Sequence, residues 1–525
     1  MPKNEVVISK ENELEDFKID LKPRIPLFPE VDHTQVNIKY PLIPPYSFAH
    51  IFWDATNKEL VYFVEEPGLN PEEKRILDLL EDGIRELVNI SFLAVKDGDT
   101  VIKYLEKNIR VLLKELKIEI TNDSYQKIMY YIYRDFVGLG KIEPFLCDYF
   151  IEDIECNGVN FPIYIIHRKY RNLRTNIIYE NADKLATFVE RLAQKCGHYI
   201  SYATPLLDGA LPDGSRVNAT FTEDITSRGP SFTIRKFTQK PWPPTKLMQL
   251  NTVSPQMLAY LWILIEYEAN IMIIGGTASG KTTFLNALAY FIPPQARVVS
   301  IEDTRELNLQ HSNWLPSVAR EGVGLTNLVG QKYGDVSLFD LLRESFRQRP
   351  DYVIVGEVRG KEAYVLFQGM SSGHPSLGTM HANSVDTLLR RLETAPINLS
   401  PSLVEILDVV CVMTQTKIKG IEVRKLREIN EIISVKEGQG AQIHTPFTWD
   451  PITDSFKFNK QSYVFNKFYL HQGISPEELM KELNLRTKLL ITLYQRGVFD
   501  FIEFRNIINE YYKDPATILR RFNVK

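Results

Sequence analysis

The chain has 525 residues, of which 44% are hydrophobic and 24% are charged, and its formal net charge is -4. At roughly 150 residues per domain this length predicts about three domains, and the composition is that of globular protein with more than one core. The slight acidity excludes a global basic field that would concentrate nucleic acid, although local basic patches remain possible.

The cysteine pattern favours a reducing compartment. None of the four cysteines forms a C-x-x-C pair, which argues against a zinc ribbon, and the set does not resemble a disulfide framework. Its members are Cys147, Cys156, Cys196 and Cys411.

No stretch of the sequence is typical of a signal peptide or a membrane span. The first 20 residues are charged and lack an apolar core. The most apolar stretch, Met257–Ile274, is interrupted by Glu266, Glu268 and Asn270, so it is predicted to be a helix followed by a buried strand. We therefore expect a cytoplasmic protein that reaches a membrane only peripherally or through a partner.

The first half of the chain is predicted to hold a flexible arm, residues 1–32, and an N-terminal domain, residues 33–240. This domain is expected in two parts that split near residue 120. The first part starts with a hairpin over residues 48–65 and continues with a helix from about Asn70. The second part is mixed α/β, and its expected strands cover residues 163–167, 217–221 and 231–237.

A proline cluster marks the predicted domain boundary. Lys240-Pro241-Trp242-Pro243-Pro244 has three prolines in four residues, which is typical of a short, stiff connector. Residues 241–250 are therefore assigned as a linker, with the prolines as its hinge.

The second half of the chain alternates apolar runs with helical stretches. This pattern predicts a mainly parallel sheet covered on both faces, that is, an α/β domain over residues 251–525. Ser337 and Ser475 each precede an acid by three residues and are expected to cap helices, the latter in a helical C-terminal extension. The expected strands cover residues 271–274, 297–301, 352–355, 376–380 and 409–415.

The stretch GGTASGKTT, Gly275–Thr283, has the pattern G-x-x-x-x-G-K-T between a predicted buried strand and a predicted helix. This context is the one that a phosphate-binding loop requires, because glycines and the helix N-terminus bring backbone N–H groups to the phosphates. We expect ATP and Mg²⁺, with Lys281 reaching the β- and γ-phosphates and the Thr282 hydroxyl as a metal ligand. The predicted nucleotide-binding residues are Gly276, Thr277, Ala278, Ser279, Gly280, Lys281, Thr282 and Thr283.

Acidic residues follow two further predicted strands. Glu357 comes just after the strand 352–355 and is a candidate to polarise the attacking water; the alternative is a surface glutamate paired with Arg359. Glu302 and Asp303 follow the strand 297–301, where Glu302 is preferred for chemistry and a turn or capping cluster is the alternative.

His381 follows another predicted strand and is expected at the same sheet edge, where it could sense the γ-phosphate; a structural histidine is the alternative. Arg216 and Arg235 lie in the preceding domain. Arginine suits bidentate contacts to phosphate, although ordinary surface arginines are the alternative.

Four of these motifs together resemble the type II/type IV secretion ATPase superfamily. The "Asp box" occupies residues 298–307, an atypical Walker B motif with Gly356-Glu357 occupies 349–360, and the "His box" occupies 371–384, all after the phosphate loop. Upstream stretches such as 151–158, 205–220 and 231–236 are also similar to the family. The resemblance covers roughly residues 40–440.

The resemblance implies a RecA-like C-terminal domain, a smaller N-terminal domain and a homo-hexamer with ATP near a subunit boundary. It implies that Glu357 is the catalytic glutamate, that Glu302 and His381 act in their boxes, and that Arg216 and Arg235 reach the nucleotide. A polytopic membrane platform protein, accessory motor proteins and, peripherally, membrane lipids are the implied partners, whereas no nucleic acid is expected.

Bacterial members of the superfamily often carry a tetracysteine zinc element. This chain has none and in this respect resembles the archaeal branch. Within it, the chain is most similar to the archaellum motor ATPases, which assemble or rotate a pilus-like filament. An archaeal pilus-assembly or secretion ATPase is the runner-up. A RecA-like motor that translocates nucleic acid and a scaffold that uses ATP only as an assembly signal are the alternatives from other classes.

Overall fold

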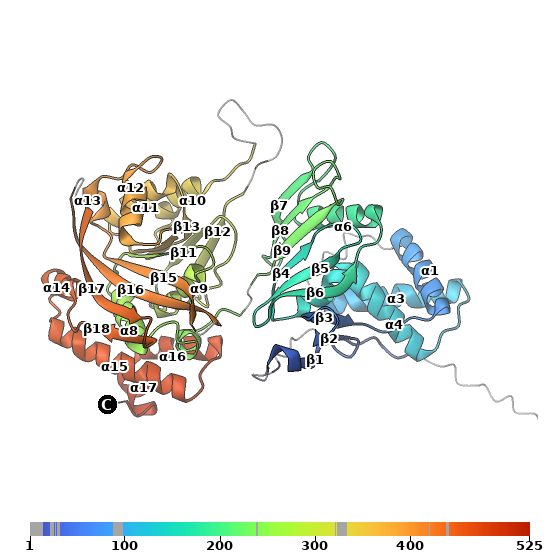
Figure 1. Cartoon of the computed structure of the whole chain (residues 1–525), viewed down its shortest axis with the longest axis horizontal. Coiled ribbons are helices and arrows are strands. Elements are labelled where there is room, and N and C mark those ends of the chain that lie inside the picture. The colour runs from blue at the N-terminus through green and yellow to red at the C-terminus, as the bar shows by residue number, and fades with distance from the viewer. Residues whose placement is uncertain are drawn as a thin grey trace, which may run out of the picture. The chain divides into compact units, whose positions relative to one another are not determined.

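The computed structural model describes residues 14–524 apart from 21–25, 27, 29–31, 88–97, 238–239, 321, 323–332, 419–420 and 437–439. The chain divides into a first unit, Met1–Phe237, and a second unit, Thr238–Lys525, each built around a nine-stranded sheet (Figure 1). Within the described ranges, no helix is both long and apolar enough to cross a membrane.

The first unit has the strand order β1-β2-β3-β6-β5-β4-β9-β8-β7, and only the β3–β6 pair is parallel. Its strands are β1 (Asn37–Ile43), β2 (Ser47–Asp54), β3 (Glu59–Glu65), β4 (Ile151–Cys156), β5 (Pro162–His167), β6 (Arg171–Ile178), β7 (Leu206–Ala210), β8 (Arg216–Thr220) and β9 (Ser231–Arg235). The described α-helices are α1 (Pro71–Leu87), α3 (Gly98–Glu115), α4 (Asn122–Ile132), α5 (Glu143–Cys147) and α6 (Ala182–Lys195).

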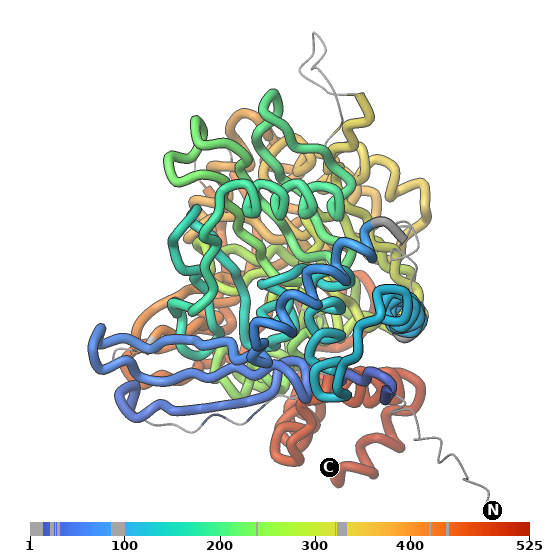
Figure 2. The backbone as a smooth tube through the Cα atoms, turned by 90° about the vertical axis from the view of Figure 1, so that its right-hand side faces the viewer, coloured from blue at the N-terminus to red at the C-terminus, as the bar shows by residue number. Residues whose placement is uncertain are grey.

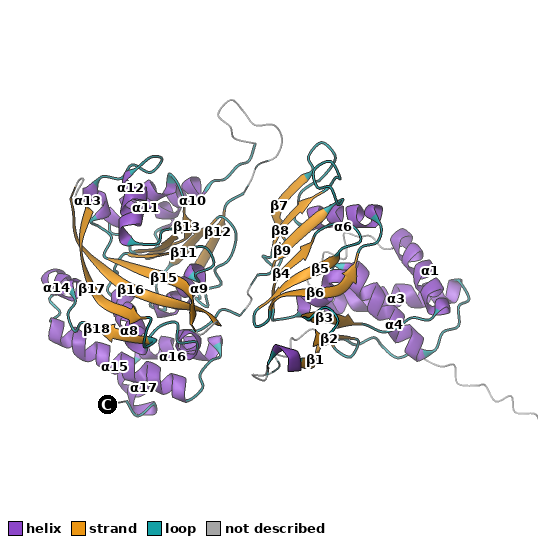
Figure 3. Ribbon diagram, in the orientation of Figure 1, coloured by secondary structure: helices purple, strands orange, loops and turns teal. Residues whose placement is uncertain are grey.

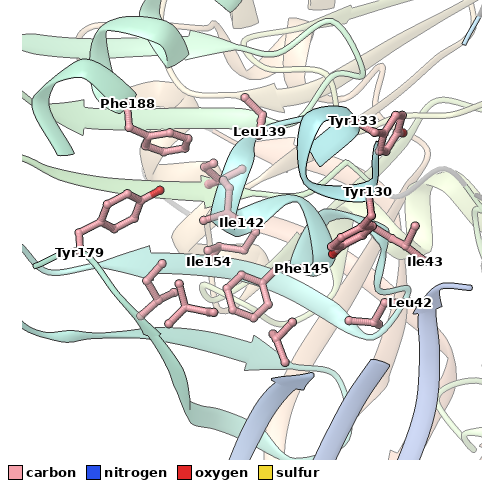
Figure 4. Close-up of a cluster of buried hydrophobic side chains, with 14 of the residues drawn as sticks. Leu42, Ile43, Tyr130, Tyr133, Leu139, Ile142, Phe145, Ile154, Tyr179 and Phe188 are labelled. Atoms are coloured by element: carbon pink, nitrogen blue, oxygen red, sulfur yellow. The ribbon is translucent and has the colours of Figure 1, made fainter. Parts of the chain in front are cut away.

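The predicted hairpin over residues 48–65 is confirmed as β2 and β3, which lie beside β1 (Figure 2, blue). The Asp54 carboxylate accepts the N–H groups of Thr56 and Asn57 and so fixes the turn. The split near residue 120 needs correction, because β3 pairs with β6 and thereby joins both predicted parts in one sheet. Their side chains also share one core, in which Leu42 and Phe188 lie in the same cluster (Figure 4).

The predicted arm, residues 1–32, also needs correction where it is described. Phe17 is 4% exposed and stacks on Tyr46, and its N–H donates to Glu106 at 2.6 Å. An aromatic side chain buried in this way anchors residues 14–20 to the first unit. Most of the remaining arm lies outside the described residues.

The second unit has the strand order β12-β11-β13-β14-β10-β15-β16-β17-β18, parallel from β12 to β15 and antiparallel beyond. The strands are β10 (Ile271–Gly275), β11 (Val298–Glu302), β12 (Trp314–Val318), β13 (Tyr352–Val358), β14 (Ser376–Met380), β15 (Val409–Ile418), β16 (Ile421–Lys436), β17 (Gly440–Asp450) and β18 (Ser455–Phe458). The α-helices are α7 (Pro244–Gln249), α8 (Pro255–Glu266), α9 (Lys281–Leu288), α10 (Leu338–Ser345), α11 (Glu362–Ser371), α12 (Val385–Glu393), α13 (Pro401–Val404), α14 (Tyr463–Gln472), α15 (Pro476–Gln495), α16 (Phe501–Lys513) and α17 (Pro515–Arg521).

Helices cover both faces of this sheet, as the sequence predicts (Figure 3). Ile271 and Ile273 of β10 enter the core formed with α8, α9, α15 and α16, whereas Met272 and Ile274 enter the core formed with α10–α13. A strand buried on both faces reads as a continuous apolar run, and every residue of β10, β11 and β14 is buried. The predicted caps at Ser337 and Ser475 are confirmed as capping boxes.

The predicted linker over residues 241–250 is wrong for most of its length. Residues 244–249 form α7, which starts at Pro244 because proline suits the first helical turn. Leu247 is buried in the second unit, and the Thr245 hydroxyl donates to the Val498 carbonyl at 2.6 Å. Apolar burial and this hydrogen bond therefore make α7 part of the second unit rather than a free connector.

Candidate nucleotide-binding site

The loop between β10 and α9 has the tight geometry that a phosphate loop needs. Ala278 and Gly280 have positive φ angles of 57° and 91°. A Cβ atom at Gly275 would lie 2.5 Å from the Met413 carbonyl oxygen, so only glycine fits there. The Arg424 Nε donates to the Ala278 carbonyl at 2.9 Å, which supports the strained alanine from β16.

Lys281, the first residue of α9, folds its side chain back over this loop. It is 7% exposed, and its Nζ donates to the carbonyls of Gly275 at 3.1 Å and Gly276 at 2.9 Å. Burial lowers the pKa of Lys281, while the charges of Glu357 and Glu306 oppose this shift. A phosphate suits this buried ammonium better than the neutral carbonyls do, because a charge-assisted hydrogen bond is stronger.

The parallel register brings Lys281, His381 and Glu357 to one edge of the sheet. Strand β14 lies between β10 and β13, with Met380 opposite Ile274 on one side and Val358 on the other. His381 Nδ1 lies 3.3 Å from Lys281 Nζ, and its Nε2 lies 3.1 Å from Glu357 Oε1. The predicted convergence of loop, glutamate and histidine is therefore what the structure shows.

Two arginine contacts extend this array. Glu357 Oε2 accepts from Arg359 Nη2 at 2.7 Å, and Arg359 Nη1 lies 3.7 Å from Asp303 Oδ2. Burial raises the pKa of Glu357, but the hydrogen bond and charge of Arg359, with smaller effects of His381 and Lys281, outweigh it and hold the pKa below its ordinary value. Glu357 is therefore a carboxylate at neutral pH, which is the form that accepts a proton from water.

His381 is a neutral imidazole in this arrangement. Burial and the nearby charge of Lys281 lower its pKa, against the opposing effect of Glu357. Because Lys281 can only donate, Nδ1 of His381 accepts and Nε2 carries the proton that faces Glu357. His381 thus lies between Lys281 of the phosphate loop and the candidate catalytic Glu357, and it contacts both.

Glu302, at the end of β11, lies beside this array rather than in it. It is 2% exposed, and its Oε1 accepts the N–H groups of Glu306 at 2.9 Å and Leu307 at 2.8 Å. Its Oε2 has no hydrogen-bond partner among the described residues. A Cβ atom at Gly356 would lie 2.9 Å from Glu302 Cγ, so glycine in the Gly356-Glu357 pair makes room for this side chain.

Glu302 should make the stability of the protein depend on pH. Burial raises its pKa to about 7 from an ordinary value of 4.5, so between these values the folded chain binds a proton that the unfolded chain does not. Stability from this group is therefore present at low pH and is lost as pH rises through 7. Relative to wild type, Glu302→Gln should gain up to about 3 kcal/mol of unfolding free energy between pH 5 and pH 8.

Urea unfolding of both proteins at several pH values measures this difference. The exposed variant Glu344→Gln serves as the control and should show no such trend. A wild-type advantage that grows toward pH 8 would contradict the assignment.

Arg216 and Arg235 lie in the first unit, where β8 and β9 pair them directly opposite each other. Like charges across a strand pair repel, and each arginine contacts an acid: Arg216 contacts Asp208 at 2.8 Å and Arg235 contacts Asp153 at 3.1 Å. The structure thus brings the two arginines together on one face of their sheet. Their predicted contact with a nucleotide stays a prediction.

Sequence reasoning missed two arginines that shape the site. Arg424 supports Ala278, and Arg391 of α12 donates to the carbonyl of His381. Both lie outside the four sequence motifs, so only the pairing of β15 with β16 and the packing of α12 reveal them.

The residues present fit a nucleoside triphosphate with Mg²⁺. The glycine cradle and Lys281 suit the phosphates, and Thr282 is half-buried at the start of α9. The described part of the chain has no cluster of three or more His, Cys, Asp or Glu side chains able to hold a metal by itself. This is compatible with Mg²⁺, which usually binds through few protein ligands, water and substrate phosphates.

Known families match two parts of the chain. The family described as "Type II/IV secretion system protein" matches residues 138–436, more than half of the chain, including the loop, Glu302, Glu357 and His381. The family described as "PilB3-like, C-terminal" matches residues 452–525.

Individual proteins are similar as well. An uncharacterized protein of Methanocaldococcus jannaschii is 36% identical over 503 residues, which cover 91% of this chain and 89% of that protein. The type IV secretion system protein PtlH of Bordetella pertussis is 32% identical over 235 residues, which cover 40% of this chain and 67% of that protein. The solved structure of the Legionella pneumophila ATPase DotB is 15% identical with a TM-score of 0.39, over 69% of this chain and 92% of that chain.

The strand order of the second unit places the two parts of the candidate site on separate strands. Strand β14 separates β10, which carries the phosphate loop, from β13, which carries Glu357. The second unit has the RecA-like α/β fold that the sequence predicts, and the first unit is the mixed α/β domain expected before it.

Proposed function

Because the chain belongs to the type II/IV secretion system protein family, we propose that it hydrolyses ATP with Mg²⁺ and converts the energy into motion of a pilus-like filament machine. The observation that carries this proposal is the array of Lys281, His381, Glu357 and Arg359 at one sheet edge. An ionised carboxylate next to a phosphate loop can orient and polarise the attacking water.

Each residue has a proposed role in this reaction. Lys281 binds the β- and γ-phosphates, Thr282 ligates Mg²⁺, Glu357 positions water, and His381 senses the γ-phosphate through its contact with Lys281. Glu302 holds the Asp-box backbone in place through the N–H groups of Glu306 and Leu307. Mg²⁺, when bound, neutralises charge on the phosphates.

Arg216 and Arg235 are proposed to contact the nucleotide from the first unit. They form a pair of guanidinium groups on adjacent strands, which suits an anion with several oxygens. Binding and loss of the γ-phosphate would then draw in and release the first unit, as in domain closure around a ligand. This motion is the proposed output of the motor.

The working assembly is proposed to be a homo-hexamer docked at the inner face of the cell membrane on a polytopic platform protein, with accessory motor proteins. For the filament there are two candidates. The loop sequence and the N-terminal extension favour an archaellum motor, which assembles or rotates its filament. The match of residues 452–525 to the PilB3-like family favours an archaeal pilus-assembly or secretion ATPase.

The test is the rate of phosphate release as a function of protein concentration, with archaeal lipid vesicles and with plasmid DNA. Turnover that rises with concentration and lipid but not with DNA is the expected result. Turnover driven by DNA would identify a nucleic-acid motor instead. Absence of phosphate release under all conditions would favour a scaffold that only binds ATP.

A further inference from the structure

Helix α9 begins at the phosphate loop, and side chains of α16 form hydrogen bonds with the carbonyls at its opposite, C-terminal end. Helix α9 continues into the 3-10 turn η4 (Ala289–Phe291), whose last carbonyls have no partner within a helix. Arg505 Nη1, on α16, donates to the carbonyls of Tyr290 at 2.6 Å and Ile292 at 3.2 Å. The Tyr512 hydroxyl, also on α16, donates to the Phe291 carbonyl at 2.6 Å. Three successive carbonyls are thus satisfied by one helix of the C-terminal extension.

Arg505 also reaches the segment that follows Glu302. Its Nη2 lies 2.5 Å from His311 Nδ1, and His311 Nε2 lies 2.6 Å from the Ala296 carbonyl. Burial lowers the pKa of His311, so the ring is neutral, with Nδ1 accepting from Arg505 and Nε2 donating to Ala296. The same guanidinium therefore joins the end of α9 to the segment after β11.

Helix α9 contacts that segment a second time, nearer the phosphate loop. Asn286 donates to the Glu306 carbonyl at 3.3 Å and accepts the N–H of Asn308 at 3.1 Å. Because Glu302 Oε1 accepts the N–H of Glu306, the hydrogen bonds form a continuous path. This path runs from α16 through α9 to the acid beside Gly356.

Two buried arginines of the C-terminal helices differ in how their charge is compensated within the described part of the chain. Arg505 is 4% exposed, and no carboxylate among the described residues forms an ion pair with it. Burial lowers its pKa to about 10, so it stays charged at neutral pH. Arg486, on α15, is 3% exposed and contacts Glu266 and Glu482. An unpaired buried charge is costly, and here the carbonyls at the end of α9 and η4 offset that cost.

We propose that Arg505 is a positioning residue of the nucleotide site, through which the C-terminal helices hold α9 in register with the segment behind Glu302. The inference rests on the proposed ATPase function. It makes the extension part of the catalytic unit, since a shift of α16 would move the helix that carries Lys281. Small displacements of this kind reduce catalysis strongly because the reacting groups must be held precisely.

Arg505→Met and Arg486→Met are a matched pair for testing this proposal. Both remove a buried guanidinium from the same group of helices, but Arg486 bonds to α8 and α15 and not to the end of α9. For the full-length variants we would measure the melting temperature, nucleotide affinity, kcat and KM. Hydrogen exchange of residues 284–292 and 302–311 would be followed in parallel. Arg505→Lys, which keeps the charge and one donor position, serves as the conservative variant.

Both methionine variants should lower the melting temperature. Only Arg505→Met should lower kcat, by about tenfold or more, and speed exchange in both segments. Arg505→Lys should restore part of each loss, and Arg486→Met should keep kcat within about twofold of wild type. Equal effects of the two methionine variants, or normal kcat and exchange in Arg505→Met, would overturn the proposal.

The proposal can still be tested if a variant does not fold or if wild type releases no phosphate. If Arg505→Met does not fold, Arg505→Lys and Tyr512→Phe provide the comparison, because each removes only part of the contact with residues 290–292. If wild type releases no phosphate, the proposed function fails on its own. The exchange rates and nucleotide affinity then still decide whether Arg505 positions α9.

Discussion

Replacing Lys281 by alanine should abolish nucleotide binding at micromolar concentrations. The side chain is buried against the loop carbonyls, so it already lies where the phosphates are proposed to bind. Losing a charge-assisted contact to phosphate in a partly desolvated site should weaken ATP affinity by at least about 100-fold. Titration with a fluorescent ATP analogue measures this loss.

Lys481→Ala, which removes an exposed lysine from α15, is the control and should bind as wild type does. The melting temperature without nucleotide should change little in Lys281→Ala, because burial already disfavours the charged lysine. Addition of ATP should raise the melting temperature of wild type and Lys481→Ala only. Unchanged ATP affinity in Lys281→Ala would refute the assignment of the loop.

The second unit could be predicted well because its signals are local. The parallel strands β10, β11 and β14 are short runs that are buried throughout, and the carboxyl ends of such strands meet at one edge. The outer strand β12 is only partly buried and has no such signal. Residues that follow different strands, such as Lys281, Glu357 and His381, were therefore expected together and are found so. The phosphate loop depends on glycines within one short stretch, residues 275–283, so its motif is visible in the sequence itself.

The remaining features depend on contacts between distant residues. The first unit becomes one sheet through the short pairing of Val61 and Tyr62 with Arg174 and Thr175, more than a hundred residues away. No periodicity encodes such a pairing. Arg505 was missed for the same reason, because only the packing of α16 brings it to residues 290–292.

The proline cluster shows how a local signal can also mislead. Three prolines in four residues predict a short, stiff connector, yet proline is also favourable in the first turn of a helix, and α7 begins at Pro244. The burial of Leu247 in the core of the second unit decides between a connector and a helix that belongs to that unit. Composition could not supply that information.

Replacing Glu357 by glutamine should separate ATP binding from hydrolysis. The amide keeps the shape of the side chain and can still accept from Arg359, but it cannot take a proton from water. Loss of a general base should lower kcat by about 10²–10⁴-fold, with ATP affinity within a few-fold of wild type. Single-turnover hydrolysis, together with nucleotide titration, measures both quantities.

The charge of Glu357 also affects its neighbours, and this gives a second readout. The carboxylate raises the pKa of His381, opposing burial and Lys281, so its removal should lower the His381 pKa further. A histidine NMR titration of wild type and Glu357→Gln measures this shift, and the exposed variant Glu344→Gln should leave it unchanged. Normal turnover in Glu357→Gln would exclude Glu357 as the base. Lost turnover with an unmoved His381 pKa would show that the glutamate acts without the contact seen at 3.1 Å.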